Sequence, residues 1–516
     1  MTAREKGKTA ASRVTALAAG IYTLSVAFSV YLLELKRRGL QFHTRDYNYF
    51  VEQAARLADP QLKDQFALNI EGYNFLGLQG VEGAASLIHA IHTEYFRYSY
   101  AALYALFRSP LALYIFYSLV FFLPVIYIAF LYRRSAFQNW RLLLLFILLY
   151  CLFPATFFAV TADLRPRLLF IPAWCLVVLA VAAHRPFLEK LLLFGLLLSI
   201  REEGIILGAG VLALNFIWTQ GKPGRWKQTA LLFALDLAAL AFFLWFMRLG
   251  GYTRVDAVFD PRIVIRDAIY QYWYLGLAAA AAALLGMAFV WRRRSHYLRE
   301  YLFLLVYLGM TAVSGFQAFR ETLRLFELEG EVGPVTLGDI LHRNLTDPLL
   351  ALWAYLALLL LVLLLEFTRG AWKGLLQGFL VGLCLFFAAY SLSALPPRVA
   401  EWRAGQGPAR LVWDFVNSHD RYETDVLADY DTYQAFYNFD RVLVFNRLPL
   451  WDTLPEKRYY PENRPALVRL VRERLEYVVI ARHSLEEISS VLEEAGVQAR
   501  TLAENETYTI LRLLPD

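Results

Sequence analysis

The sequence predicts an α-helical polytopic membrane protein with a small α/β domain at its C-terminal end. Of its 516 residues, 58% are hydrophobic and only 19% are charged, whereas soluble proteins average about 45–50% apolar and about 25% charged residues. The apolar residues fall in blocks of about 20, the length that a helix needs to cross the hydrocarbon layer of a membrane. This pattern excludes a soluble enzyme, a disordered chain and a disulfide-stapled secreted domain.

The apolar blocks predict about 9–11 membrane-spanning helices. The uninterrupted blocks cover residues 14–35, 110–131, 140–160, 167–184, 226–248, 269–291, 299–319, 348–366 and 372–394. The first block is too long for a signal-peptide core and lacks a small-residue cleavage site, so we expect an uncleaved first span. A further apolar stretch, 188–218, is divided at its centre by Arg201-Glu202-Glu203.

Basic residues predict the orientation of these spans. They cluster in the loops Arg133–Arg141, Lys222–Lys227 and Arg292–Arg299 and at the N-terminus, which the positive-inside rule places in the cytoplasm. Both flanks of 188–218 are then cytoplasmic, which favours a helical hairpin with its charged tip on the far side. The alternative is one overlong span, which would invert every later span. The run Lys36-Arg37-Arg38 would lie outside, against the rule, so either the topology differs there or these charges face an anion.

With this topology the protein lies in the plasma (inner) membrane, and its C-terminal tail is extracytoplasmic. We expect a multi-pass domain over 1–395, with a large first outer loop over 37–109, and a soluble α/β domain over 396–516, divided at Pro396-Pro397. Strands are expected at Asp425–Asp429, Val442–Asn446, Tyr477–Ala481 and Tyr508–Leu514, with helices over 464–475 and 484–495. The tail lacks GxGxxG and the P-loop, and no basic stripe carries interleaved aromatics, so neither a nucleotide nor a nucleic acid is an expected partner.

Ionisable residues at the membrane edge are costly, so each is a functional candidate. Asp46 follows the first span, Asp163 occupies the short turn between the third and fourth spans, and Glu202 and Glu203 form the hairpin tip. The topology places all four acids on one outer face. His92 belongs to a predicted amphipathic surface helix over 87–107 and would lie at the mouth of the same site.

This arrangement suits transfer from an anionic lipid-linked donor. A carboxylate within hydrogen-bond reach can act as general base toward an acceptor hydroxyl, and guanidinium groups match phosphate oxygens in a bidentate way. The candidate phosphate-binding residues are Arg37, Arg38, Arg165, Arg167 and Arg201. Asp46 and Asp163 are also hard oxygen ligands for Mg²⁺ or Mn²⁺, although neither has an acidic neighbour. The alternative is that these acids are loop residues paired with nearby arginines.

The acids after span one and between spans three and four resemble those of the polytopic lipid-sugar glycosyltransferases, the GT-C superfamily. A related bacterial multi-pass membrane family is similar over nearly the whole chain. Its matching stretches are His92 before Tyr100–Leu111, Asp163-Leu164-Arg165-Pro166, and Arg201-Glu202-Glu203-Gly204. The resemblance implies inverting or retaining transfer of a sugar from a polyprenyl phosphate on the extracytoplasmic side. It implies Asp46 as catalytic base and Asp163 as its partner acid or metal ligand.

Three functions remain open on sequence. The leading hypothesis is a membrane glycosyltransferase with a polyprenyl-phosphate sugar donor and a glycan, lipid or protein acceptor. The second is a transporter or flippase of a lipid-linked or anionic solute, in which the mid-span Asp236 takes part in a relay. The third is a non-catalytic membrane scaffold whose α/β tail docks a partner. Loss of activity on changing Asp46, Asp236 or the tail would distinguish them.

Overall fold

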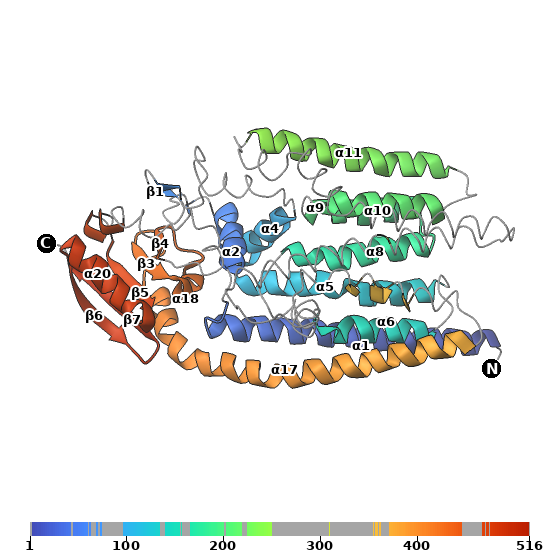
Figure 1. Cartoon of the computed structure of the whole chain (residues 1–516), viewed down its shortest axis with the longest axis horizontal. Coiled ribbons are helices and arrows are strands. Elements are labelled where there is room, and N and C mark those ends of the chain that lie inside the picture. The colour runs from blue at the N-terminus through green and yellow to red at the C-terminus, as the bar shows by residue number, and fades with distance from the viewer. Residues whose placement is uncertain are drawn as a thin grey trace, which may run out of the picture.

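A computed structural model shows a mostly helical protein with a small β-sheet near its C-terminal end (Figure 1). The structure describes residues 3–42, 45–59, 61–62, 69–70, 73–74, 96–134, 140–154, 156, 166–200, 203–218, 224–249, 371–445 and 467–514, the last range without 470 and 474, and a few positions between 309 and 362. Within this part of the chain, three helices are long and apolar enough to cross a membrane.

These three helices are α1 (Ala3–Arg38), α5 (Pro110–Arg133) and α17 (Ala371–Ser418). Three others, α6 (Trp140–Leu152), α8 (Phe170–Ala182) and α11 (Arg225–Leu249), also coincide with predicted spans. The predicted spans 269–291, 299–319 and 348–366 fall wholly or mostly outside the described residues. The helical class is therefore confirmed, whereas the number of spans stays a prediction.

The stretch 188–218 folds as two antiparallel helices, as the charge at its centre predicts. Helix α9 (Phe187–Ile200) is followed by α10 (Glu203–Trp218). Near the start of α9, Lys190 Nζ donates to Asn215 Oδ1 near the end of α10 at 2.8 Å. At the other end, Gly204 lies directly against the Leu197 backbone. The start of α9 thus lies beside the end of α10, and the end of α9 beside the start of α10, as in a helical hairpin.

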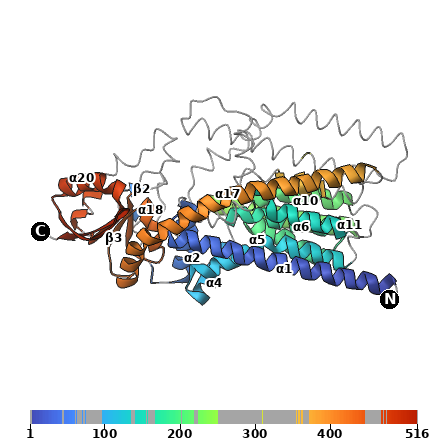
Figure 2. The ribbon, with the colours of Figure 1, turned by 90° about the horizontal axis from the view of Figure 1, so that it is seen from below.

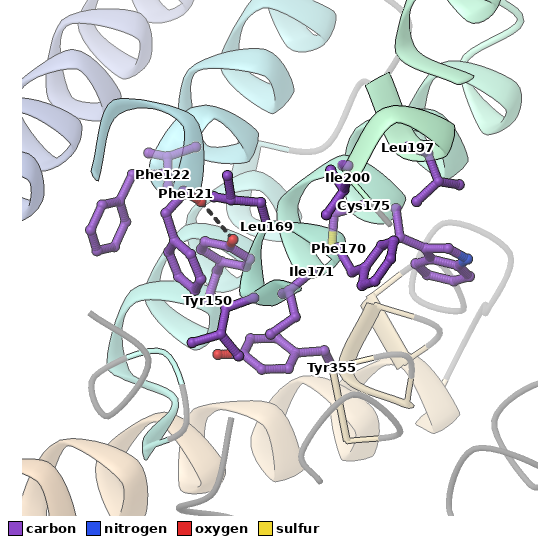
Figure 3. Packing of buried hydrophobic residues seen from close by; sticks show 14 of the residues in the cluster. Phe121, Phe122, Tyr150, Leu169, Phe170, Ile171, Cys175, Leu197, Ile200 and Tyr355 are labelled. Atoms are coloured by element: carbon purple, nitrogen blue, oxygen red, sulfur yellow. Dashed lines mark hydrogen bonds between the residues drawn. The ribbon is translucent and has the colours of Figure 1, made fainter. Parts of the chain in front are cut away.

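The helices of the bundle pack side by side (Figures 1 and 2) around a core rich in aromatic residues. Figure 3 shows the part of this core between α5, α6 and α8, where the Tyr150 hydroxyl donates to the Phe121 carbonyl oxygen at 2.7 Å. Between α1 and α5, Ser29 and Ser118 share a buried hydrogen bond of 2.7 Å. Such bonds satisfy polar groups that would otherwise face hydrocarbon.

The C-terminal sheet has the strand order β4-β3-β5-β7-β6. Strands β3 (Val426–Asp429), β4 (Val442–Phe445) and β5 (Tyr477–Ala481) are parallel, and β7 (Tyr508–Leu514) runs antiparallel between β5 and β6 (Gln498–Glu504). Helix α20 (Leu485–Ala495) covers one face with Ile488 and Val491. The four expected strands and the helix over 484–495 are confirmed; β6 is an addition, since its exposed residues lack an alternating pattern.

Helix α17 belongs to both parts of the protein. It runs without interruption through Pro396 and Pro397, where the sequence predicts the domain boundary, and Ala409, Val412 and Phe415 pack in the core of the sheet. The division at 395/396 stays a prediction. Figures 1 and 2 place the N-terminus and the C-terminal sheet at opposite ends of the molecule. The end of the bundle nearer the sheet is called the sheet-side end below.

Two short helices lie at the sheet-side end: α2 (Arg45–Ala58) and α4 (Arg97–Phe107). Helix α4 ends at Phe107, and the φ of the following residue, Arg108, is 51°, in the left-handed region. The next residue, Ser109, caps α5 by accepting a hydrogen bond from Leu111 N, and Pro110 occupies the first turn, where no N–H is needed. The sequence Arg108-Ser109-Pro110 thus stops one helix and starts another. Strands β1 (Asn69–Ile70) and β2 (Tyr73–Asn74) form a small hairpin.

The close approach of α9 and α10 gives a stability prediction. A Cβ added at Gly204 would collide with the backbone of Leu197, which has no freedom to rotate away. We expect Gly204→Ala to lower the free energy of unfolding by about 1–3 kcal/mol, measured by thermal unfolding in detergent. Gly195 of α9 has open space around its Cα, so Gly195→Ala is the matched control and should not destabilise. Equal stability of the two variants would contradict the hairpin packing.

Candidate functional site

Two of the four predicted acids lie in helices that the structure describes. Asp46 lies in the first turn of α2 and Glu203 is the first residue of α10; for both, the structure describes the backbone position and not the side chain. Asp163, Glu202 and His92 lie outside the described residues. Their roles therefore stay predictions.

Of the five candidate phosphate-binding arginines, Arg37 and Arg38 are described with their side chains. Arg167 lies in the short helix η1 (Pro166–Leu169), where only its backbone is described, and Arg165 and Arg201 lie outside the described residues.

Described residues close in sequence to the predicted site residues lie together at the sheet-side end. Phe96 N, just before α4, donates to Ser199 O near the end of α9 at 2.9 Å. Helix η1 contacts both α5 and α9, and α2 packs on α4. Segments far apart in sequence, each next to a predicted site residue, thus lie together at one end of the bundle.

The basic run at the end of α1 is folded onto its own helix. Arg37 donates to both Glu34 carboxylate oxygens at 2.8 Å, and its guanidinium lies 4.8 Å from the centre of the Trp413 ring. Arg38 donates only its Nε to Glu34, at 2.9 Å, and 64% of its side chain is exposed. Lys36 is buried, with its ammonium over the Phe42 ring. Of these three cations, Arg38 is therefore the one that presents its guanidinium outward.

Arg38 lies at one end of a groove between α1, α5 and α17, which has a volume of about 920 Å³. Its walls include the apolar side chains of Val26, Val30, Leu111, Ile115 and Leu119. Its lining along α1 runs from Tyr22 to Arg38, about 24 Å at 1.5 Å per residue. That length is most of the roughly 30 Å hydrocarbon core of a bilayer.

The charged end of the groove is formed by two helices. Arg38 and Glu34 come from α1, and Arg403 and Gln406 come from α17. Arg403 Nη2 donates to the Tyr31 hydroxyl at 3.0 Å, which ties α17 to α1. Tyr31 is itself 47% exposed, so the groove opens to the side of the bundle. Sequence patterns did not identify Arg403, because its charge follows the last predicted span in a segment assigned to the tail.

A buried carboxylate at the end of α2 joins three segments. Asp59 Oδ2 accepts from Tyr422 OH at 2.9 Å, from Arg108 at 3.2 Å and from Arg421 at 3.4 Å. Burial alone would raise the pKa of Asp59, but the hydrogen bonds from Gln61 N and Tyr422 and the two arginine charges outweigh it and lower this pKa. Asp59 is therefore ionised at neutral pH and fastens α2 and α4 to the region before β3.

One described cluster has the geometry of metal ligands. Asp429, Asp431 and His483 place ligand atoms within 4.8 Å of one another at the carboxyl ends of β3 and β5. Burial raises the pKa of Asp429, and its two oxygens accept hydrogen bonds from four donors, which belong to Thr432, Ala481 and Ser484. This carboxyl group therefore organises the turn after β3.

The lowered pKa of Asp59 predicts a pH dependence of stability. Its contribution is complete above the ordinary value of 3.8 and is lost as the pH falls through the lower value of the folded protein. We expect Asp59→Asn to cost about 1–3 kcal/mol of unfolding free energy at neutral pH, and the difference from wild type to shrink in acid. The control is Asp414→Asn, which removes an exposed ion pair with Arg410 and should cost less than about 1 kcal/mol. A pH-independent difference in thermal unfolding would contradict an ionised Asp59.

No protein-family model and no curated protein matches the chain. The chain is similar to two solved structures of ArnT from Cupriavidus metallidurans, one bound to undecaprenyl phosphate and one in the apo state. The first has a TM-score of 0.45 and 12% identity, and the second 0.44 and 13%. Each match covers 96% of this chain and 98% of the other. At these values the likeness does not by itself assign a function, which therefore rests on the residues of this chain.

Proposed function

We propose that the protein is a membrane glycosyltransferase that moves a sugar from a polyprenyl-phosphate donor to an acceptor on the extracytoplasmic face. The observation that supports this most is the groove between α1, α5 and α17, which is apolar along the bundle and ends in Arg38 and Arg403. A polyprenyl phosphate has the same division, a long apolar chain with an anionic end. The proposal includes a cytoplasmic N-terminus and an extracytoplasmic sheet.

The groove resembles this donor in having an apolar length and one charged end. An anion is strongly disfavoured in hydrocarbon, so a lipid phosphate must lie at the membrane edge. There, guanidinium groups from two different helices can bind its oxygens with charge-assisted hydrogen bonds. Glu34 accepts from Arg37 and from Arg38 Nε, which orients the Arg38 side chain and offsets part of the positive charge.

The proposed sugar transfer uses the acids that the sequence predicts for this site. In the proposed step, an acceptor hydroxyl oxygen bonds to the anomeric carbon of the sugar while the bond from that carbon to the phosphate oxygen breaks. The hydroxyl proton passes to Asp46 as general base. The leaving polyprenyl phosphate keeps the bonding electron pair, and Arg38 and Arg403 stabilise its charge. Asp163 is the proposed partner acid. If the reaction uses a divalent cation, Asp46 and Asp163 would hold it.

A second function, transport of a lipid-linked or anionic solute, is favoured by Asp236. This residue lies in the middle of α11 and is buried, with Oδ1 facing Gly208 of α10. Among the described residues, Oδ1 has no hydrogen-bond partner. A carboxyl group in such a place is a candidate for a proton relay. In vesicles, transport that is lost in Asp236→Asn and kept in Asp46→Asn would favour this function over transfer.

The groove gives a test of donor binding. Arg38→Ala and Arg403→Ala should each weaken binding of undecaprenyl phosphate by roughly 10- to 100-fold, because a hydrogen bond to a charged group contributes about 1.5–3 kcal/mol. Binding is measured by titration into protein held in lipid nanodiscs. Arg410 lies on the same helix, α17, and is exposed, so Arg410→Ala is the matched control and should bind normally. Equal binding by all three variants would exclude the groove as the phosphate site.

The assigned base gives a test of catalysis. Asp46→Asn keeps the size of the side chain and removes its basicity, so transfer should fall about 10²–10⁴-fold while undecaprenyl phosphate binding stays within twofold of wild type. Transfer is measured by mass spectrometry with a panel of polyprenyl-phosphate hexoses and pentoses. Full activity of Asp46→Asn would refute its role as base, and the absence of transfer by wild type with every donor would refute the enzyme assignment.

A further inference from the structure

Arg56 of α2 lies almost wholly buried between α2 and the C-terminal region, with 9% of its side chain exposed. Its Nε donates to Glu52 Oε1 at 2.7 Å, and its Nη2 donates to the carbonyl oxygens of Phe439 and Asp440 at 3.3 and 3.4 Å. Its Nη1 lies 3.6 Å from Asp440 Oδ1. One guanidinium thus contacts its own helix and the turn that precedes β4.

Glu52, one turn earlier in α2, completes this arrangement. Its second oxygen, Oε2, accepts a hydrogen bond from the hydroxyl of Tyr433, which ends the short helix α18 (Tyr430–Tyr433) after β3. Burial alone would lower the pKa of Arg56, but the charges of Glu52 and Asp440 outweigh it and raise this pKa. The four side chains, Glu52, Arg56, Tyr433 and Asp440, are called the α2 latch below.

The two ends of α2 are tied to the same region. Before α2, Phe42 N donates to Gln434 Oε1 at 3.1 Å. After α2, Asp59 accepts from Arg421, whose own carbonyl oxygen accepts from Asp440 N at 2.8 Å. Figures 1 and 2 both show α2 between the sheet-side end of the bundle and α18. Helix α2 is therefore held against the C-terminal region before, along and after its length.

The geometry of the latch suits positioning. Coulomb attraction between exposed charges is weak and tolerates movement, whereas a buried guanidinium with acceptors in several directions allows only one placement of its helix. The latch lies two to three turns from the start of α2, and the helix is rigid over that distance. Displacement of the latch would therefore move the first turn of α2, which contains Asp46.

We propose that Arg56 is a positioning residue, which fixes α2 on the C-terminal region and so places the base Asp46 at the donor. This inference rests on the proposed function, because it requires Asp46 to act on the substrate. On this proposal, the C-terminal region is the fixed support for α2 and thereby holds Asp46 in position.

The test compares Arg56→Met, Arg56→Lys, Tyr433→Phe and the control Arg410→Ala in nanodiscs. Three quantities are measured for each: kcat for sugar transfer, binding of undecaprenyl phosphate, and hydrogen exchange of the amides of residues 45–58. We expect kcat of Arg56→Met to fall on the order of 10- to 100-fold, the effect of a small displacement of a catalytic group. Donor binding should stay within twofold, and exchange should rise in α2 and not in α5.

The conservative variants separate positioning from a general loss of structure. Arg56→Lys keeps the charge but supplies fewer fixed donors, so kcat should recover part of the way toward wild type. Tyr433→Phe removes one hydrogen bond to Glu52 and leaves Arg56 in place, so it should show a smaller change of the same kind. It also keeps the test decisive if Arg56→Met does not fold. Arg410→Ala should match wild type in all three measurements.

The possible results test the latch, the positioning role of Arg56 and the proposed function separately. Unchanged exchange of α2 in folded Arg56→Met and in Tyr433→Phe would overturn the latch. Raised exchange with unchanged kcat would overturn positioning while leaving the latch intact. Equal losses of donor binding and kcat would show a general structural defect and also overturn positioning. Absence of transfer by wild type would overturn the proposed function, and with it the catalytic part of this inference, whereas the exchange of α2 would still decide the latch.

Discussion

The fold depends on one constraint: a charge inside or beside the hydrocarbon layer must find a partner within the protein. The buried Lys190 of α9 illustrates it, because its ammonium donates to Asn215 of α10 and lies 3.5 Å from Gln228 Oε1 of α11. One charge thereby links three consecutive helices. At the other end of the bundle, Glu34 accepts from two arginines of the last turn of α1. The partners of Lys190 thus also fix how α9, α10 and α11 pack, whereas those of Glu34 lie on the same helix.

The elements that the sequence predicts well are those with a local signal. Blocks of apolar residues identify α1, α5, α6, α8 and α11, and charges at the centre of 188–218 identify the α9–α10 hairpin. Alternating or continuous apolar residues identify β3, β4, β5 and β7. The sequence does not predict strand β6, because its residues are exposed on both sides and show no periodic pattern. The order of the strands depends on pairing across the sheet, which no local pattern contains.

The candidate site shows the same limit at the level of single residues. Arg38 is predicted from the run of charge that ends the first span. Arg403 is not, since it lies 372 residues from Tyr31, its partner, and only the packing of α17 on α1 brings both to the groove. Arg56 and Asp440 are 384 residues apart and meet for the same reason. Each of these pairs joins α1, or the helix α2 that follows it, to the last quarter of the chain.

Helix α17 joins the groove to the sheet. Its 48 residues have a contour length of about 72 Å at 1.5 Å per residue, and Figure 1 shows that the helix is curved. Gln406 on this helix lines the groove, while Pro408 accepts from Asn505 of the β6–β7 turn at 2.8 Å and Trp413 donates to Arg38 O at 3.2 Å. The groove and the sheet therefore share one short segment of α17, from Gln406 to Phe415. A substitution that shifts this segment alters the lining of the groove and the packing of the sheet together.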